Sequence, residues 1–161
     1  MVSAGRPETY QYTGQCAVTV FTMADSIRED ILKRFNGNPP VRPESLVEFE
    51  ARSGVRLPDE YKSFLLRSNG GEGFIGEAYI MLSPLEELLE MNASYEVEIN
   101  APDLFVFGSD GGGEAFAFRL SCGAGSVVMF PWIGVDAEST IEMASSFNQF
   151  LERLYRSGVS F

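Results

Sequence analysis

Apolar side chains recur at helical spacing through the first part of the chain. Ile27, Ile31 and Phe35 follow one another every four residues, which predicts a helix over residues 25–35. A similar pattern predicts a second helix over residues 43–53. Each of these helices is expected to bury one face and to expose the other.

Proline and glycine mark the limits of a third helix. Pro58 stands where proline is favoured, at the first turn of a helix, and two acidic residues follow it in that turn. Asn69-Gly70-Gly71 ends the helix. The residues expected on its buried face are Tyr61, Phe64, Leu65 and Ser68.

Shorter apolar runs in the second half of the chain have the composition of β-strands. These runs are residues 74–82, 104–107, 115–120 and 127–130. In the third run, large apolar residues alternate with other residues, which predicts that this strand buries a single face. The alternating residues are Phe116, Phe118 and Leu120.

Two Ser-x-x-Glu sequences, Ser83–Glu86 and Ser139–Glu142, have the pattern of a helix capping box. The first predicts a short helix with Leu85, Leu88 and Leu89 on its apolar side, and residues 95–101 after it form a polar connector. The second predicts the closing helix, whose apolar stripe is Met143, Phe147, Phe150, Leu151 and Leu154. Helices come first, strands follow and a helix closes the chain, which is the order of an α+β domain.

A chain of 161 residues is long enough for one domain with a hydrophobic core. We assign residues 23–161 to that domain and residues 1–22 to an N-terminal extension. Apolar residues and cysteine fall on even positions within the extension, from Tyr10 to Val20, so it is expected to form an edge strand or a tail.

The chain contains no histidine, which excludes Ser-His-Asp and Cys-His catalysis and histidine-based zinc sites. Its two cysteines, Cys16 and Cys122, are too few for a secreted disulfide framework, and whether they pair is left open. There is no secretory signal and no apolar run long enough to span a membrane, so the cytoplasm is the expected location.

Charge is distributed unevenly along the chain. The net charge is −11, yet residues 1–67 carry nine acidic and nine basic residues and so sum to zero. Ten acidic residues and no lysine or arginine lie between Ser68 and Phe118. Such a surface repels phosphate backbones and anionic lipids, so we expect no nucleic acid or membrane partner. It would attract a basic protein, although acidic surface also serves solubility alone.

The glycine-rich loop Gly108–Gly113 lacks the Lys-Ser/Thr pair and the following helix of a phosphate-binding loop, and it is expected to be a hairpin turn. Asp110 and Glu114 flank these glycines but supply too few oxygens for a calcium site. Either could form a carboxylate pair with Glu72 or Glu77, as glycoside hydrolysis requires. Such pairs arise by chance in a chain with 23 acidic residues, so no catalytic residue is assigned.

Two further side chains have alternative interpretations. Cys122 lies in a turn of small residues and has no histidine to activate it, so it is expected to be an inert thiol. Trp132 follows Pro131 at a strand end, where it is either the edge of the core or an exposed anchor for a partner.

Several motifs in this order resemble the SUKH superfamily, which includes the fungal Smi/Knr-type cell-wall regulators and many bacterial immunity proteins. The most specific is Leu57-Pro58-x-x-Tyr61, followed by Asn69-Gly70-Gly71. The supporting motifs are Leu46–Glu50, Phe107-Gly108 with the glycine-acid loop, and Ala144-x-x-Phe147-x-x-Phe150-Leu151. The resemblance covers roughly residues 25–155.

The resemblance implies an α+β fold with a central, mostly antiparallel sheet packed by about four helices. It also implies a protein-binding module with no catalytic residues, no cofactor and no metal. The residues that the shared motifs assign to the fold are Leu57, Pro58, Tyr61, Asn69, Gly70, Gly71, Gly108 and Gly112.

We therefore expect an immunity protein that neutralises a cognate basic toxin, of the nuclease or deaminase type. The candidate contacts are Glu72, Glu77, Asp110, Glu114 and Trp132. The alternative is a Smi/Knr-like regulatory or scaffolding module with a cellular protein as partner, and a carboxylate-based hydrolase is a remote third. The identity of the partner and the oligomeric state are left open.

Overall fold

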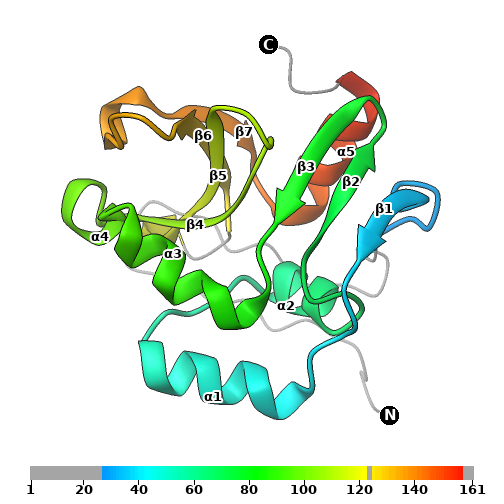
Figure 1. The fold of residues 1–161 in the computed structure, drawn as a ribbon, viewed down its shortest axis with the longest axis horizontal. Helices are drawn as coiled ribbons and strands as arrows, with labels where there is room; N and C mark the ends of the chain where they lie inside the picture. The colour runs from blue at the N-terminus through cyan, green and yellow to red at the C-terminus, as the bar shows by residue number, and fades with distance from the viewer. Residues whose placement is uncertain (1–26, 123–124, 158–161) are drawn as a thin grey trace, which may run out of the picture.

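The computed structural model describes residues 27–122 and 125–157, and its central element is a seven-stranded sheet. All neighbouring strands are antiparallel and follow the order of the chain (Figure 1). The strands are β1 (Arg34–Gly37), β2 (Gly71–Ile75), β3 (Ala78–Leu82), β4 (Leu104–Ser109), β5 (Glu114–Arg119), β6 (Val127–Pro131) and β7 (Ile141–Ala144). The predicted α+β class and antiparallel sheet are confirmed.

Five α-helices and three short 3-10 helices are described. The α-helices are α1 (Pro43–Ser53), α2 (Asp59–Leu65), α3 (Leu88–Ser94), α4 (Val97–Asn100) and α5 (Phe147–Ser157). The 3-10 helices are η2 (Leu85–Glu87), η3 (Leu120–Cys122) and η4 (Ala137–Ser139). The helices predicted over residues 43–53 and after Pro58 are therefore confirmed, and the former ends at Gly54 with a φ of 75°.

Helices α1, α2 and α5 contribute to the main core on one face of the sheet. Tyr61 lies at the centre of this core, with its ring centroid 5.0 Å from that of Phe118 and 5.2 Å from that of Phe147. The rings of Phe107 and Phe118 stack at 4.2 Å. The aromatic side chains predicted on the buried faces of α2 and α5 thus form one continuous cluster with those of the sheet.

A second, smaller core lies on the opposite face of β4, β5 and β6. Val97 of α4 and Ala101 belong to this core together with Ala115 and Ala117 of β5, and α3 and α4 lie beside β4 (Figure 1). The prediction that β5 buries a single face is therefore wrong. The predicted polar connector over residues 95–101 is also wrong, because it contains the short helix α4 and because Val97 and Ala101 are buried in the second core.

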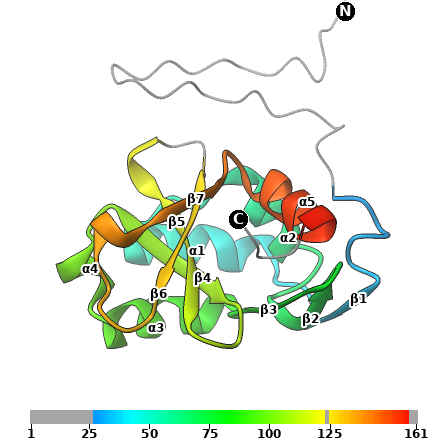
Figure 2. The same ribbon diagram turned by 90° about the horizontal axis from the view of Figure 1, so that it is seen from above.

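The predicted helix over residues 25–35 is wrong where the structure describes it. Residues 29–33 form turns, and residues 34–37 form the edge strand β1 (Figure 2). Two glycines of β2 permit this pairing, because a Cβ on Gly71 would lie 2.3 Å from the Asn36 carbonyl oxygen and one on Gly73 would lie 2.5 Å from that of Arg34. Both glycines have positive φ angles.

The strand predicted over residues 74–82 is two strands, because Gly76, with a φ of 62°, turns the chain between β2 and β3. Neither predicted capping box forms. Ser83 donates to the sulfur of Met91, and Ser139 lies in η4. Residues 141–144 pair with β6 as the edge strand β7, so the closing helix begins only at Phe147.

The predicted extension over residues 1–22, including Cys16, lies outside the described residues. Cys122 is the last residue of η3.

Candidate partner-binding site

The turn between β4 and β5 is held by one carboxylate. Asp110 Oδ1 accepts hydrogen bonds from the backbone N–H groups of Gly112 at 2.8 Å and Glu114 at 3.1 Å. Gly111, between Asp110 and Gly112, has a φ of 77°, in the left-handed region that favours glycine. The predicted hairpin is confirmed, and the Asp110 side chain has a structural role in it besides its charge.

The backbone of Trp132 is attached to the same turn. Its N–H donates to the carbonyl oxygen of Gly113 at 2.8 Å, directly beyond the pair formed by Glu114 and Pro131. Three candidate residues are thereby brought to one end of the sheet: Asp110 follows β4, Glu114 begins β5 and Trp132 follows β6.

An aromatic pair joins this end to the helices. The ring of Trp132 lies 4.1 Å from that of Tyr95, measured between centroids, at an interplanar angle of 33°. Tyr95 follows α3 directly and is 45% exposed, and Ile133 beside Trp132 is 93% exposed. Exposed aromatic and apolar side chains of this kind are typical anchors of protein interfaces.

The residue after Tyr95 has an unusual backbone. Glu96 has a φ of 52° and is the one non-glycine residue with positive φ within the described ranges. A left-handed conformation is costly for a residue with a side chain, and it persists where the surroundings impose it. Here it separates α3 from α4, so that Tyr95 contacts Trp132 while Val97 enters the second core.

Glu72 reaches the same region through an intervening ring. The hydroxyl of Tyr79 donates to Glu72 Oε2 at 2.9 Å, and this hydrogen bond, together with partial desolvation, raises the pKa of Tyr79. The ring of Tyr79 also borders the β4–β5 turn, because a Cβ on Gly111 would lie 3.1 Å from its Cδ1.

Glu77 lies apart from the turn that holds Asp110. It occupies the tip of the β2–β3 hairpin, where its carboxylate is 3.8 Å from Arg34 Nη1 and almost fully exposed. Arg34 in turn lies over the ring of Phe74, 4.7 Å from its centroid. Glu77 therefore forms an exposed ion pair with Arg34, away from the other candidate residues.

The residues assigned to the fold by their motifs lie in or beside the core, except Gly112, which is exposed in the β4–β5 turn. Leu57 and Tyr61 are buried, and Pro58 borders Gly125. Gly70 and Gly108 are sites of close backbone approach, since a Cβ would lie 2.4 Å from the Leu82 oxygen and 2.5 Å from the Met81 oxygen, respectively. A Cβ on Gly112 would only make ordinary contacts with Asp110.

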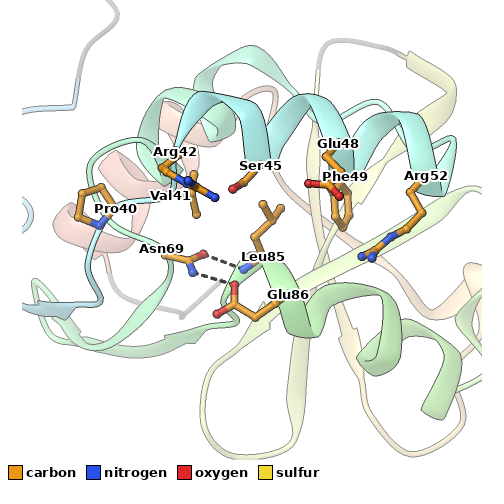
Figure 3. Close-up of a pocket in the computed structure, with 10 residues that line it drawn as sticks. All are labelled: Pro40, Val41, Arg42, Ser45, Glu48, Phe49, Arg52, Asn69, Leu85 and Glu86. Atoms are coloured by element: carbon orange, nitrogen blue, oxygen red, sulfur yellow. Dashed lines mark hydrogen bonds between the residues drawn. The ribbon is translucent and has the colours of Figure 1, made fainter.

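Asn69 has a role that the sequence pattern did not indicate. Its Oδ1 accepts from the backbone N–H of Leu85 at 2.7 Å, and its Nδ2 donates to Glu86 Oε2 at 2.9 Å (Figure 3). Asn69 therefore caps η2 from a distant point in the chain, in the place where a Ser83 capping box was predicted.

Neither a metal nor a membrane site emerges from the part of the chain that the structure describes. Across residues 27–122 and 125–157, no three Cys, Asp or Glu side chains converge as metal ligands would. Within the same ranges, every helix is too short or too polar to cross a bilayer.

Comparison with known proteins agrees with the motifs. The SMI1 / KNR4 family (SUKH-1) matches residues 40–153, which is more than half of the chain. A stretch of 58 residues is 38% identical to the uncharacterised protein YnaB of Bacillus subtilis (strain 168). That match covers 36% of this chain and 38% of YnaB, so it spans less than half of either protein. On the extent of the family match, the chain belongs to the SMI1 / KNR4 family (SUKH-1).

Proposed function

We propose that this protein is an immunity protein that binds and blocks a basic toxin domain of the nuclease or deaminase type. The observation that carries the proposal is the grouping of Asp110, Glu114 and Trp132 at one end of the sheet, with the ring of Tyr95 packed against that of the tryptophan. Membership of the SMI1 / KNR4 family supports a role in protein binding. The proposed role is a binding function without catalysis, exercised in the cytoplasm.

Charge supports the choice of partner. A toxin that acts on nucleic acid carries a basic surface for its substrate, and the segment from Ser68 to Phe118 of this chain has ten acidic residues and no basic one. Acidic groups at the rim of an interface mainly accelerate association with a basic partner. We therefore expect Glu72 and Glu114 to steer the encounter.

The aromatic pair supports a stable complex. Tryptophan and tyrosine are enriched among the residues that contribute most to binding free energy, especially where a polar rim excludes water from them. Trp132 is half-buried against Tyr95, so its ring is held in place before a partner arrives. Such preorganisation lowers the entropy that binding costs.

Co-expression with the toxin domain encoded by a neighbouring gene tests the proposal. The wild-type chain should restore growth of cells that produce the toxin, and Trp132→Ala should reduce the protection. Ile99→Ala is the matched control, because Ile99 is an exposed apolar residue of α4 that no ring contact ties to the site. Failure of the wild-type chain to bind or protect would contradict the proposal.

A regulatory or scaffolding role is the second candidate, because the matching family carries the name SMI1 / KNR4. In that case the partner is a cellular protein and no toxin gene adjoins this one. The two proposals differ in the outcome of the co-expression experiment: a scaffolding module gives no protection against any neighbouring gene product.

A further inference from the structure

A groove runs along α1 (Figure 3). It is separate from the end of the sheet that holds Asp110, Glu114 and Trp132, which we call the Trp132 site. It has a volume of about 340 Å³, with α1 as one wall and Asn69 and η2 as the other. The α1 wall consists mainly of positions three or four residues apart, which share one helix face. These residues are Arg42, Ser45, Phe49 and Arg52.

An arginine stands at each end of this wall. Arg42 immediately precedes α1 and Arg52 lies in its last turn, ten residues later, which corresponds to about 15 Å along a helix axis. Both side chains are exposed. Within residues 27–122 and 125–157, neither has an ion pair or side-chain hydrogen bond, whereas Arg28, Arg67 and Arg119 each hold a carboxylate.

Two apolar side chains form the floor of the groove at its middle. Phe49 and Leu85, each about 95% or more buried, approach one another between the two walls. Of the two acids that line the groove, Glu86 is engaged by Asn69 and Glu48 is exposed on α1. Neither acid forms an ion pair with Arg42 or Arg52 within the described residues, so both guanidinium groups are available to a ligand, and Phe49 and Leu85 border the space between them.

We infer that this groove binds an extended peptide segment with an acidic residue at each end and an apolar residue in the middle. An extended chain rises about 3.3 Å per residue, so acids four positions apart are separated by about 13 Å and lie on the same side of the strand. Carboxylates at that spacing reach both guanidinium groups, and the central side chain on the same side faces Phe49 and Leu85. The groove would then select acidic segments, whereas the Trp132 site selects a basic partner.

Fluorescence polarisation with a labelled five-residue peptide tests the inference. The probe has capped ends, glutamate at both ends, leucine at the centre and serine between them. It should bind the wild-type chain saturably and more weakly as salt rises. Arg42→Glu combined with Arg52→Glu should weaken binding roughly tenfold or more, because both charge pairs are reversed.

Matched controls separate this effect from general charge. Arg56→Glu changes an exposed arginine outside the groove and should leave binding unchanged. A peptide with lysine at both ends should not bind. Thermal unfolding checks that each variant is folded. If the double variant with two glutamates is unfolded, Arg42→Gln combined with Arg52→Gln takes its place.

Three results would overturn the inference: no saturable binding by the wild-type chain, equal binding of the lysine peptide, or full binding by the folded double variant. A second copy of this chain is the competing occupant. Sedimentation that shows a dimer of the wild-type chain, lost in the double variant, would assign the groove to self-association and overturn the peptide inference. Variants at Asp110 and Glu114 should keep peptide binding, so the two sites can fail independently.

Discussion

The side chain of Asn92 forms with Val106 both hydrogen bonds that a neighbouring strand would form. Asn92 Oδ1 accepts from the Val106 N–H at 2.8 Å, and its Nδ2 donates to the Val106 carbonyl oxygen at 2.9 Å. Strand β3 pairs with β4 only through Met81 and Leu82, so the sheet offers Val106 no strand on that side. A buried side chain of α3 therefore satisfies the backbone of β4.

Replacement of Asn92 by alanine is predicted to destabilise the fold by about 3 kcal/mol, because two buried backbone groups lose their partners. The free energy of unfolding in urea measures this loss. Asn100→Ala is the control: Asn100 is exposed and donates only to the Glu96 carbonyl oxygen of its own turn, so about 0.5 kcal/mol or less is expected. An equal loss of unfolding free energy in the two variants would show that the two hydrogen bonds between Asn92 and Val106 do not stabilise the fold more than an exposed hydrogen bond does.

Gly73→Ala is predicted to detach β1 from the sheet. The added Cβ would lie 2.5 Å from the Arg34 oxygen, at a φ of 147° that alanine strongly disfavours. We expect a loss of about 2 kcal/mol or more and faster hydrogen exchange at β1. Gly113→Ala should stay within about 0.5 kcal/mol of the wild-type chain, since nothing lies within 4 Å of its Cβ position. Unchanged exchange at β1 in the Gly73 variant would refute the prediction.

Tyr61→Phe is predicted to leave the fold as stable at neutral pH, or to stabilise it by about 1 kcal/mol. The Tyr61 hydroxyl is buried and has no hydrogen-bond partner among the described residues, so its removal relieves an unmet desolvation cost. Urea unfolding at pH 7 checks this outcome. A loss above 1 kcal/mol would mean that the hydroxyl has a partner, such as a buried water.

The same variant also tests how the stability of the fold depends on pH. Burial raises the pKa of Tyr61 above its ordinary value of 10.0, so the folded chain holds this proton more tightly than the unfolded chain. The contribution of this tighter proton binding to the free energy of unfolding is fully present below pH 10, and it is lost as the pH rises towards the pKa of Tyr61 in the folded chain. Above pH 10, wild-type stability should fall relative to Tyr61→Phe by about 1.4 kcal/mol per pH unit. Parallel stability curves from pH 8 to 11 would contradict the burial effect.

Asn69→Asp is predicted to cost about 1 to 2 kcal/mol at pH 7. The variant still accepts from Leu85, but its second oxygen faces the Glu86 carboxylate where the amide donated at 2.9 Å. Glu86→Gln in the same chain should recover most of the loss, since it restores a donor and removes the repulsion. No recovery in the double variant would show that the pair is energetically unimportant.

Most segments with a continuous apolar stripe or run were predicted correctly from the sequence, because that pattern decides their burial. The stripes of α1, α2 and α5 and the apolar runs of β4 and β6 are of this kind. The stripe over residues 25–35, by contrast, does not form a helix where the structure describes it. The edge strands β1 and β7 were missed because each has four residues and depends on its neighbour. For β1 the informative signal is in β2, where glycines at alternate positions permit close approach.

The candidate site was predictable only in part. The acidic turn and Trp132 stand out in the sequence, but nothing local indicates that Tyr95 packs against Trp132, because 37 positions separate them and α4 was not predicted. The sequence likewise did not indicate that the side chains of Asn69 and Asn92 hydrogen-bond to backbone groups of distant segments. Such roles depend on which segments the tertiary fold brings together, and a single sequence does not encode them locally.

The kinetics of toxin binding at several salt concentrations test the central claim most directly. Asp110→Asn with Glu114→Gln removes two charges and keeps the Asp110 oxygen that caps the turn, whereas Glu44→Gln with Asp59→Asn makes the same change on α1 and α2. We predict that the first pair lowers the association rate severalfold and flattens its salt dependence, and that the second pair does neither. Association with the cognate toxin that is independent of salt, or equally slow in both pairs, would contradict an acidic binding site at this end of the sheet.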